Sequence, residues 1–229
     1  MRKVLSYPIC IDSPGWPGNP TFCYEPFTSI KKGDACNTYT LQLFNHFGSH
    51  IDAPRHFVEN RLAIDELPFD TFLYESPLLL DVPKSFDEKI QPEDLRPYAQ
   101  QLARCDLLMI RTGMDKARRN DPENYCNHNP SMSAACARYL QDNFGGTLKA
   151  VALDFLSLAS PQDPEDGNLS HQYLLGMYHT SAICVIEDIN LDALPTHLDK
   201  VYAIPLLLHG VDSAPVTMWV EYDLQKGVE

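Results

Sequence analysis

No stretch of the 229 residues is apolar over the roughly 20 positions that a membrane-spanning helix requires. The first residues, MRKVLSYPICIDSPGW, also lack the long apolar region of a secretory signal peptide. We therefore expect a cytoplasmic protein that does not associate with a membrane.

Clusters of positive charge are equally scarce. The formal net charge is −13, and Arg118 and Arg119 are the only adjacent arginines. Nucleic-acid affinity depends on clustered lysine and arginine side chains. The sequence thus argues against a nucleic-acid partner.

The cysteines form no recognisable motif. Seven are present, an odd number, and no CxxC pair occurs among them. A chain of this length does not need disulfide staples, so reduced and mostly buried thiols are expected. No cysteine has a histidine partner in a known nucleophile motif, which disfavours a catalytic thiol.

Internal repeats, low-complexity segments and a clear linker are absent as well, so residues 1–229 are predicted to form one domain. Eight short runs favour β-strands, and three segments with helical spacing are interleaved with them. This order predicts an α/β fold with a mixed sheet. The strand runs are 4–11, 38–44, 78–82, 107–111, 150–155, 182–186, 201–208 and 216–222, and the helical segments are 91–104, 131–144 and 169–177.

Residues 13–27 contain four prolines and two glycines, which predicts an extended loop. Trp16, one of only two tryptophans, lies within it. Such a loop either wraps the surface or overhangs a pocket.

The segment from His46 to His56 reads HFGSHIDAPRH and holds the most informative pattern. Three of the eight histidines and one aspartate fall within it. Imidazole nitrogen and carboxylate oxygen are ligands that divalent ions such as zinc accept. The cluster therefore favours a metal site over ordinary hydrogen bonding at the end of a strand.

Backbone periodicity predicts that these side chains converge. Residues two apart on a strand point to the same face, so His50 and Asp52 are expected to share one. Gly48 can let the chain bulge and turn His46 to that side, and Pro54 can turn it again to bring His56 near. Because imidazole titrates near neutral pH, His56 is then either a proton carrier or a further ligand.

The same segment resembles the HxGTHxDxPxH signature of the cyclase family, which includes bacterial kynurenine formamidases and isatin hydrolases. Here Ser49 stands at the threonine position. Other segments resemble family motifs in the right order along nearly the whole chain, although Asn19 replaces an aspartate in the first of them. They are WPGN at 16–19, LMIRTG at 108–113, VALD at 151–154, SHQYLL at 170–175, VIED at 185–188, IPLLL at 204–208 and DSAPV at 212–216.

The resemblance implies a swivelling β/β/α fold that holds one or two zinc or manganese ions. By position, the family's metal ligands match His46, His50 and Asp52 for the first ion, with Asp52 able to bridge to a second held by His171 and Glu187.

Two neighbours compete for the distal positions. His179 lies in the stretch between the distal histidine and glutamate, which is longer than in the formamidases, and Asp188 adjoins the glutamate. Either residue is an alternative distal ligand.

The resemblance also assigns roles outside the ligand set. His56 matches the family's catalytic histidine, and Trp16 matches an aromatic residue that lines the substrate pocket. Subunits of the family associate, so a homodimer or homotetramer is expected.

Together these features predict a hydrolase that cleaves a C–N amide bond in a small molecule. The substrate would be an aryl formamide such as N-formylkynurenine, or a small cyclic amide. A metal ion would activate water, and His56 would carry the proton to the leaving nitrogen. Two alternatives are a metal-dependent lyase or cyclase on the same scaffold, and a non-catalytic metal-binding protein.

Overall fold

A nine-stranded mixed sheet forms the centre of the protein in the computed structural model, which describes residues 1–223. The strand order is β5-β12-β13-β4-β11-β10-β8-β6, and β1 pairs with β13 beside this path. Neighbours from β11 to β6 are parallel, and the other pairings are antiparallel. The strands are β1 (Arg2–Val4), β4 (His50–Asp52), β5 (Leu73–Tyr74), β6 (Pro77–Asp81), β8 (Leu107–Arg111), β10 (Ala150–Leu153), β11 (Cys184–Glu187), β12 (Lys200–Pro205) and β13 (Ser213–Glu221).

Two hydrophobic cores divide the protein into layers, because side chains alternate along each strand. Leu107 and Met109 of β8 belong to a core that they share with the antiparallel strands, for example with Met218 of β13. Leu108 and Ile110 instead join a core that includes the helices. The layers are therefore sheet, sheet and helix, which confirms the predicted α/β class with a mixed sheet.

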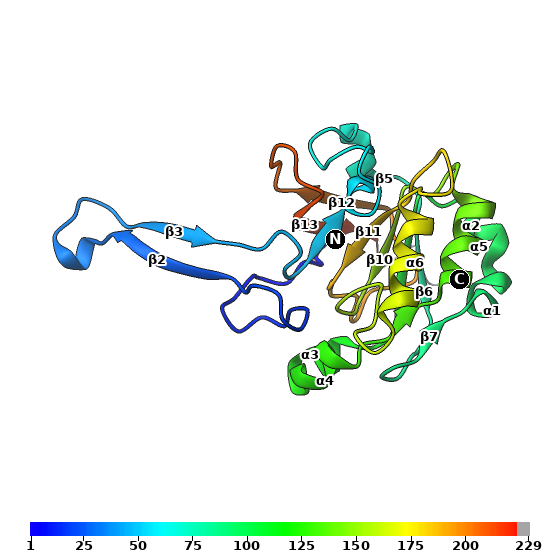
Figure 1. The fold of residues 1–229 in the computed structure, drawn as a ribbon, viewed down its shortest axis with the longest axis horizontal. Coiled ribbons are helices and arrows are strands. Elements are labelled where there is room, and N and C mark those ends of the chain that lie inside the picture. The colour runs from blue at the N-terminus through cyan, green and yellow to red at the C-terminus, as the bar shows by residue number, and fades with distance from the viewer. Residues whose placement is uncertain (224–229) are drawn as a thin grey trace.

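The two longest helices, α5 (Ala134–Phe144) and α6 (Pro164–Leu174), lie side by side against the parallel strands (Figure 1). Ser133 caps α5 and Asp163 caps α6, each accepting a hydrogen bond from a backbone N–H of the first turn. The remaining elements are short: α1 (Pro92–Leu95), α2 (Ala99–Leu102), α3 (Asp115–Asn120), α4 (Pro122–Asn127), and the parallel pair β7 (Lys89–Ile90) and β9 (Ser131–Met132).

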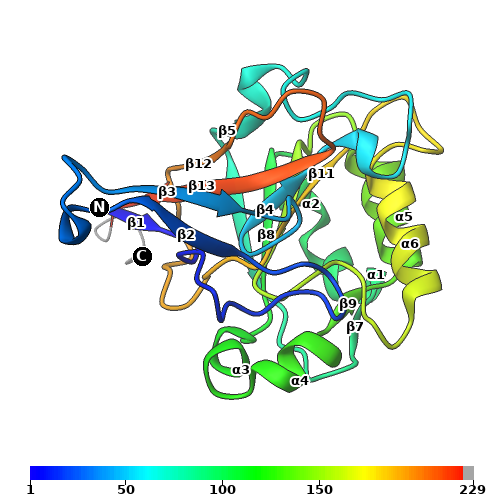
Figure 2. The ribbon, with the colours of Figure 1, turned by 60° about the vertical axis from the view of Figure 1, so that its left-hand side comes forward.

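A two-stranded hairpin projects from the body of the protein (Figures 1 and 2). It consists of β2 (Cys23–Thr28) and β3 (Thr38–Gln42), which pair only with each other. The prediction of a loop over residues 13–27 is therefore wrong beyond residue 22. Residues 23–28 form a strand because they pair with β3. A proline is tolerated in β2 because it is an edge strand, whose outer side has no neighbouring strand that requires an N–H donor.

Prolines account for two other differences from the predicted elements. The expected helix over 91–104 is interrupted by a 3₁₀ turn at Arg96–Tyr98 that contains Pro97. The expected strand over 4–11 ends at Val4, and beyond it the chain makes only an isolated bridge at Ser6 before Pro8.

None of the helices within residues 1–223 is long and apolar enough to cross a membrane. All seven cysteines are free, and only three of them are buried: Cys105, Cys136 and Cys184. The expectation of mostly buried thiols is thus wrong for the N-terminal cysteines, two of which lie in or beside the exposed hairpin.

Candidate metal centre

Strand β4 places two candidate ligands at the middle of the sheet. His50 and Asp52 point to the helical side, whereas Ile51 between them enters the other core. Both polar side chains are almost fully buried, at 4% and 1% exposure. The shared face predicted from the two-residue spacing is confirmed.

Turns on either side of β4 bring in the other two histidines of the motif. Gly48 adopts a positive φ of 68°, which a residue with a side chain would rarely tolerate, and so folds His46 back toward Asp52. After β4, Pro54 opens a 3₁₀ turn, Pro54–His56, that carries His56 to the same place. The rings of His46 and His56 lie 4.1 Å apart.

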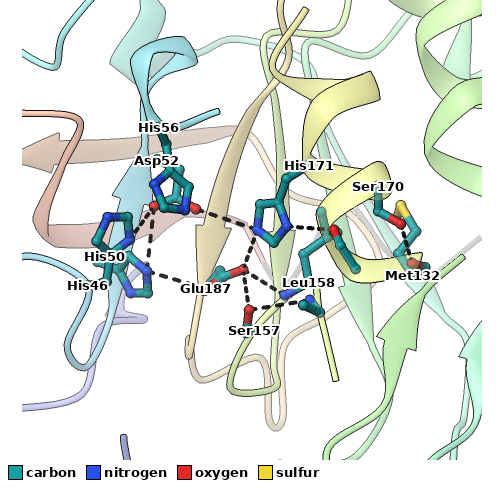
Figure 3. Close-up of polar contacts among 12 residues, drawn as sticks. His46, His50, Asp52, His56, Met132, Ser157, Leu158, Ser170, His171 and Glu187 are labelled. Atoms are coloured by element: carbon teal, nitrogen blue, oxygen red, sulfur yellow. Dashed lines mark hydrogen bonds and ion pairs between the residues drawn. The ribbon is translucent and has the colours of Figure 1, made fainter. Parts of the chain in front are cut away.

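The two distal candidate ligands, Glu187 and His171, lie on β11 and α6. Glu187 ends β11 and lies opposite His50 in the antiparallel register, while His171 projects from α6 above them (Figure 3). The structure thus brings together all five predicted ligands. It places His179 and Asp188 elsewhere: His179 pairs with Asp142 at the surface, and Asp188 faces away.

Each buried histidine is fixed so that one ring nitrogen remains for the centre. Nδ1 of His50 lies 2.8 Å from the carbonyl oxygen of Gly48, and Nδ1 of His171 lies 2.9 Å from that of Gly167. A carbonyl oxygen can only accept, so each Nδ1 carries the hydrogen. In the neutral ring Nε2 then presents a lone pair, the arrangement found in metal-binding histidines.

Several atoms in this centre have no hydrogen-bond partner. Nε2 of His50 and both carboxylate oxygens of Asp52 are buried without a hydrogen bond of normal geometry, although Nδ1 of His46 lies 3.0 Å from Oδ1 of Asp52. Leaving such groups unsatisfied costs about 1–3 kcal/mol each. An ion between them would remove this cost.

The spacing of these atoms suits a small divalent ion. Ligand atoms bound tetrahedrally at 2.0–2.2 Å lie about 3.4 Å from one another. Nε2 of His50 is 3.3 Å from Glu187 and 3.6 Å from Asp52, and Nε2 of His171 is 3.5 Å from Glu187. Nitrogen and carboxylate donors at these separations fit the predicted metal.

We call His50, Asp52, His171 and Glu187 the inner group. Their side chains are 1–5% exposed. Burial alone would raise the pKa of Asp52, but the charges of His56 and His46 outweigh it and hold that pKa well below its usual range. For Glu187, burial is likewise outweighed, here by the close approach of the His171 and His50 imidazoles, and its pKa falls to about 2. Both carboxylates are therefore ionised and ready to bind a cation.

Glu187 is also held by the loop that follows β10. Its Oε1 accepts hydrogen bonds from the hydroxyl of Ser157 at 3.1 Å and from the backbone N–H of Leu158 at 2.6 Å. These contacts leave Oε2 facing His50. Nothing in the motif itself indicated Ser157.

A third carboxylate, Asp212, joins the site from just before β13. Its Oδ2 lies 2.9 Å from Nε2 of His46 and 2.7 Å from Nδ1 of His56, and Asn45 donates to its Oδ1 at 2.8 Å. We call His46, His56 and Asp212 the outer group, whose side chains are 15–32% exposed. Asp212 opens the DSAPV segment, which carried the resemblance without suggesting a role for this residue.

Charge around His46 favours its protonated imidazole when no metal is present. Burial would lower the pKa of His46, but Asp52 and Asp212 outweigh it and raise that pKa to about 10. Hydrogen bonds from His46 and His56 hold the pKa of Asp212 well below its usual range. A metal ion at His46 must therefore displace a proton.

The inner and outer groups line one end of a cavity of about 270 Å³. Trp16, Phe44 and Phe57 form its apolar wall, and Asn19 and Asn168 add amide groups. Phe57 stacks on the ring of His171 at 4.8 Å. Trp16 thus overhangs a pocket, the second of the two outcomes considered for its loop.

Comparison with known proteins agrees with this geometry. Residues 4–160 match the sequence model of a family described as Putative cyclase. The chain belongs to this cyclase family. The match includes the whole segment from His46 to His56, and it confirms the resemblance drawn from the motifs.

Three individual relatives are similar to this chain, two of them over nearly its whole length. An uncharacterized protein of Haemophilus influenzae is 38% identical over 128 residues, which are 56% of this chain and 89% of that one. A kynurenine formamidase of Bacillus anthracis is 27% identical over 213 residues, or 93% of each chain. Isatin hydrolase A from Labrenzia aggregata shares the fold with a TM-score of 0.80 and 20% identity, over 96% of this chain and 93% of that one.

Proposed function

We propose that this chain is a metal-dependent hydrolase that cleaves a C–N amide bond in a small molecule. The observation that carries the proposal is that His50 and Asp52 present buried atoms without hydrogen-bond partners at the end of an aromatic cavity. The kynurenine formamidase and isatin hydrolase relatives support the same reaction class.

His46, His50 and Asp52 would hold one ion, and Asp52, His171 and Glu187 would hold a second. The two oxygens of Asp52 support this division, since Oδ1 faces His46 and His50 while Oδ2 faces His171. The nitrogen and oxygen donors suit zinc or manganese. When bound, such an ion acidifies water and polarises a carbonyl group.

His56 would move the proton. Its Nδ1 is held by Asp212, which orients the ring, and the side chain lines the cavity. Nε2 can therefore accept a proton from the attacking water and deliver it to the departing nitrogen. Asp212 also binds His46, so its carboxylate holds the proposed proton carrier, His56, beside a proposed metal ligand, His46.

The cavity would select the substrate. Trp16, Phe44 and Phe57 can pack against an aromatic ring and exclude water from the reacting amide. This favours an aryl formamide such as N-formylkynurenine, or a small cyclic amide such as isatin. The free cysteines suit a reducing compartment, and we place the enzyme in the cytoplasm.

A substrate screen in water enriched in oxygen-18 tests the reaction. Metal-loaded protein should cleave N-formylkynurenine, isatin, a hydantoin or a simple lactam, and the product should carry one solvent oxygen. Metal-free protein gives the control. Turnover without incorporation of solvent oxygen would identify a lyase or cyclase instead, and no turnover of any amide would leave a non-catalytic metal-binding protein.

A further inference from the structure

Asp188, the residue that follows Glu187 at the end of β11, has an unusual backbone conformation. Its φ is +53°, in the left-handed region that residues with a side chain enter only at a cost. Within residues 1–223, Asp87 and Ala193 are the other residues with a side chain and a positive φ, and both are exposed, whereas Asp188 is buried. Backbone strain persists only where the surrounding structure fixes it, and it clusters at functional sites. Here it lies one residue from a candidate metal ligand.

The side chain of Asp188 is held by a buried ion pair. Nε and Nη2 of Arg118, on α3, donate to its two carboxylate oxygens at 2.6 and 2.7 Å. The hydroxyl of Tyr125, on α4, donates to Oδ1 at 2.6 Å. The guanidinium of Arg118 also lies over the ring of Tyr7, 3.7 Å from its centroid. The side chains of Arg118 and Asp188 are only 10% and 1% exposed, so solvent screens their interaction weakly.

The backbone of Asp188 connects the two strands that carry metal ligands. Its N–H donates to the carbonyl oxygen of Phe155 at 3.0 Å, and its own carbonyl oxygen accepts from the hydroxyl of Ser49 at 2.5 Å. Ser49 precedes His50, and the antiparallel register sets His50 opposite Glu187. A hydrogen bond therefore joins the neighbour of one candidate ligand to the neighbour of the other.

Stability alone does not account for this arrangement. A buried ion pair is often no more stabilising than apolar side chains of the same volume. Glycine adopts a φ near +53° without the strain that an aspartate carries. The carboxylate of Glu187 is held separately, by Ser157 and Leu158. Glu187 is thus fixed at both ends, its backbone through Asp188 and its carboxylate through the loop after β10.

We infer that Arg118 and Asp188 are positioning residues for Glu187 in the metal centre. Their ion pair fixes the end of β11 against β4. The oxygens of Glu187 are thereby held 3.3 Å from Nε2 of His50 and 3.5 Å from Nε2 of His171, between the two rings (Figure 3). The inference rests on the proposed function, because it requires that Glu187 binds an ion.

The first test compares two adjacent arginines of α3. Arg118→Met removes the partner of Asp188, whereas Arg119→Met removes the partner of another buried aspartate, Asp115. Metal-free protein is titrated with zinc in a calorimeter. The dissociation constant should rise about 10-fold or more in Arg118→Met, as for other residues that support metal ligands, and stay unchanged in Arg119→Met. The visible spectrum of the cobalt-loaded protein reports ligand geometry, so it should change in Arg118→Met alone.

A double variant separates positioning from stability. Arg118→Met leaves a buried carboxylate unpaired, which lowers the Tm. Arg118→Met/Asp188→Gly removes both charges and the backbone strain, so its Tm should exceed that of Arg118→Met. Its zinc affinity should nevertheless remain weak and its cobalt spectrum altered, because nothing then holds the end of β11. If Arg118→Met alone does not fold, the double variant is compared with Arg119→Met instead.

Two results would overturn the inference while leaving the proposed function intact. One is a wild-type zinc affinity and cobalt spectrum in Arg118→Met or in the double variant. The other is an equal loss of affinity in Arg118→Met and Arg119→Met. A wild-type protein that binds neither zinc nor cobalt would contradict the proposed function, and the inference with it.

Discussion

The inner and outer groups of the candidate metal centre differ in how their polar atoms are satisfied. In the inner group, His50 and Asp52 are buried and present atoms without hydrogen-bond partners. In the outer group, His46 and His56 are more exposed, and both are bound by Asp212. Buried polar atoms without hydrogen-bond partners destabilise the fold unless a ligand binds them. Imidazoles that are paired and accessible to solvent can exchange protons. This difference supports a cation site in the inner group and a proton carrier, His56, in the outer group.

The largest effect is expected from Asp52→Asn, which removes the carboxylate at the centre of the inner group. Metal affinity should fall by more than about 100-fold, since even the outer partners of metal ligands are worth 10–100-fold, and activity should be lost with it. Asp154→Asn is the control. Asp154 is a buried aspartate that binds the backbone N–H groups of Thr112 and Gly113 outside the site. It should lower stability while metal binding persists, and loss of metal in both variants would contradict the assignment.

His56→Ala should distinguish metal binding by the inner group from proton transfer by the outer group. We expect the variant to retain its metal while the chemical step slows by about 10²–10⁴-fold, the usual contribution of general acid–base catalysis. Metal content and turnover are measured on the same preparation. His128→Ala, which removes a surface histidine paired with Asp87, should change neither. If His56→Ala loses metal as readily as His50→Ala, then His56 is a ligand and the proton carrier lies elsewhere.

Asp212→Asn should have a smaller effect in the same direction. The amide keeps the shape but loses the charge that holds His46 and His56, so turnover should fall by about 10–100-fold with most of the metal retained. Asp65→Asn, at a surface carboxylate bound to His209, is the matched control. Turnover equal to wild type would show that Asp212 does not orient the proton carrier.

The smallest effect is expected in the pH dependence of stability. The metal-free protein should lose stability as pH rises, and added metal should oppose that loss. The pKa of His46 is raised from 6.5 to about 10, so its contribution to the metal-free protein is complete below pH 6.5 and is lost as pH rises toward 10. The pKa of Glu187 is lowered from 4.5 to about 2, so its contribution is present above pH 4.5 and is lost at lower pH.

Metal-free protein should therefore have its highest Tm between about pH 4.5 and 6.5. Metal binds deprotonated ligands, so the increase in Tm on adding metal should grow from pH 6.5 to 10. Thermal unfolding followed with and without metal across this range gives both curves. A Tm increase that shrinks with rising pH would mean that the metal does not compete with a proton on His46.

Local sequence was sufficient to single out four of the seven residues in the two groups. His46, His50, Asp52 and His56 lie in one short segment, where a positive-φ glycine and a proline fix their directions. His171 and Glu187 could be assigned only through the resemblance. Asp212 was not assigned, because a single aspartate far along the chain gives no signal until the sheet places β13 beside β4.

The fold likewise has elements that their own residues predict and elements that depend on distant contacts. Strand β8 was predicted at its observed bounds, and β6, β10 and β11 were predicted to within two residues of theirs. These parallel strands are buried on both faces, so they appear in the sequence as nearly continuous apolar runs. Strand β2 was predicted as part of a loop because residues 13–27 contain four prolines and two glycines. Its structure depends on pairing with β3, and the sequence of β2 alone does not predict that pairing.

The metal content of the purified protein tests the central claim most directly. Elemental analysis should find zinc or manganese at one equivalent per chain or more, and protein stripped with a chelator should recover it when metal is added back. Less than about a tenth of an equivalent, with no binding on addition of either metal, would contradict the account, because the unpartnered atoms of His50 and Asp52 would then have no ion to satisfy them.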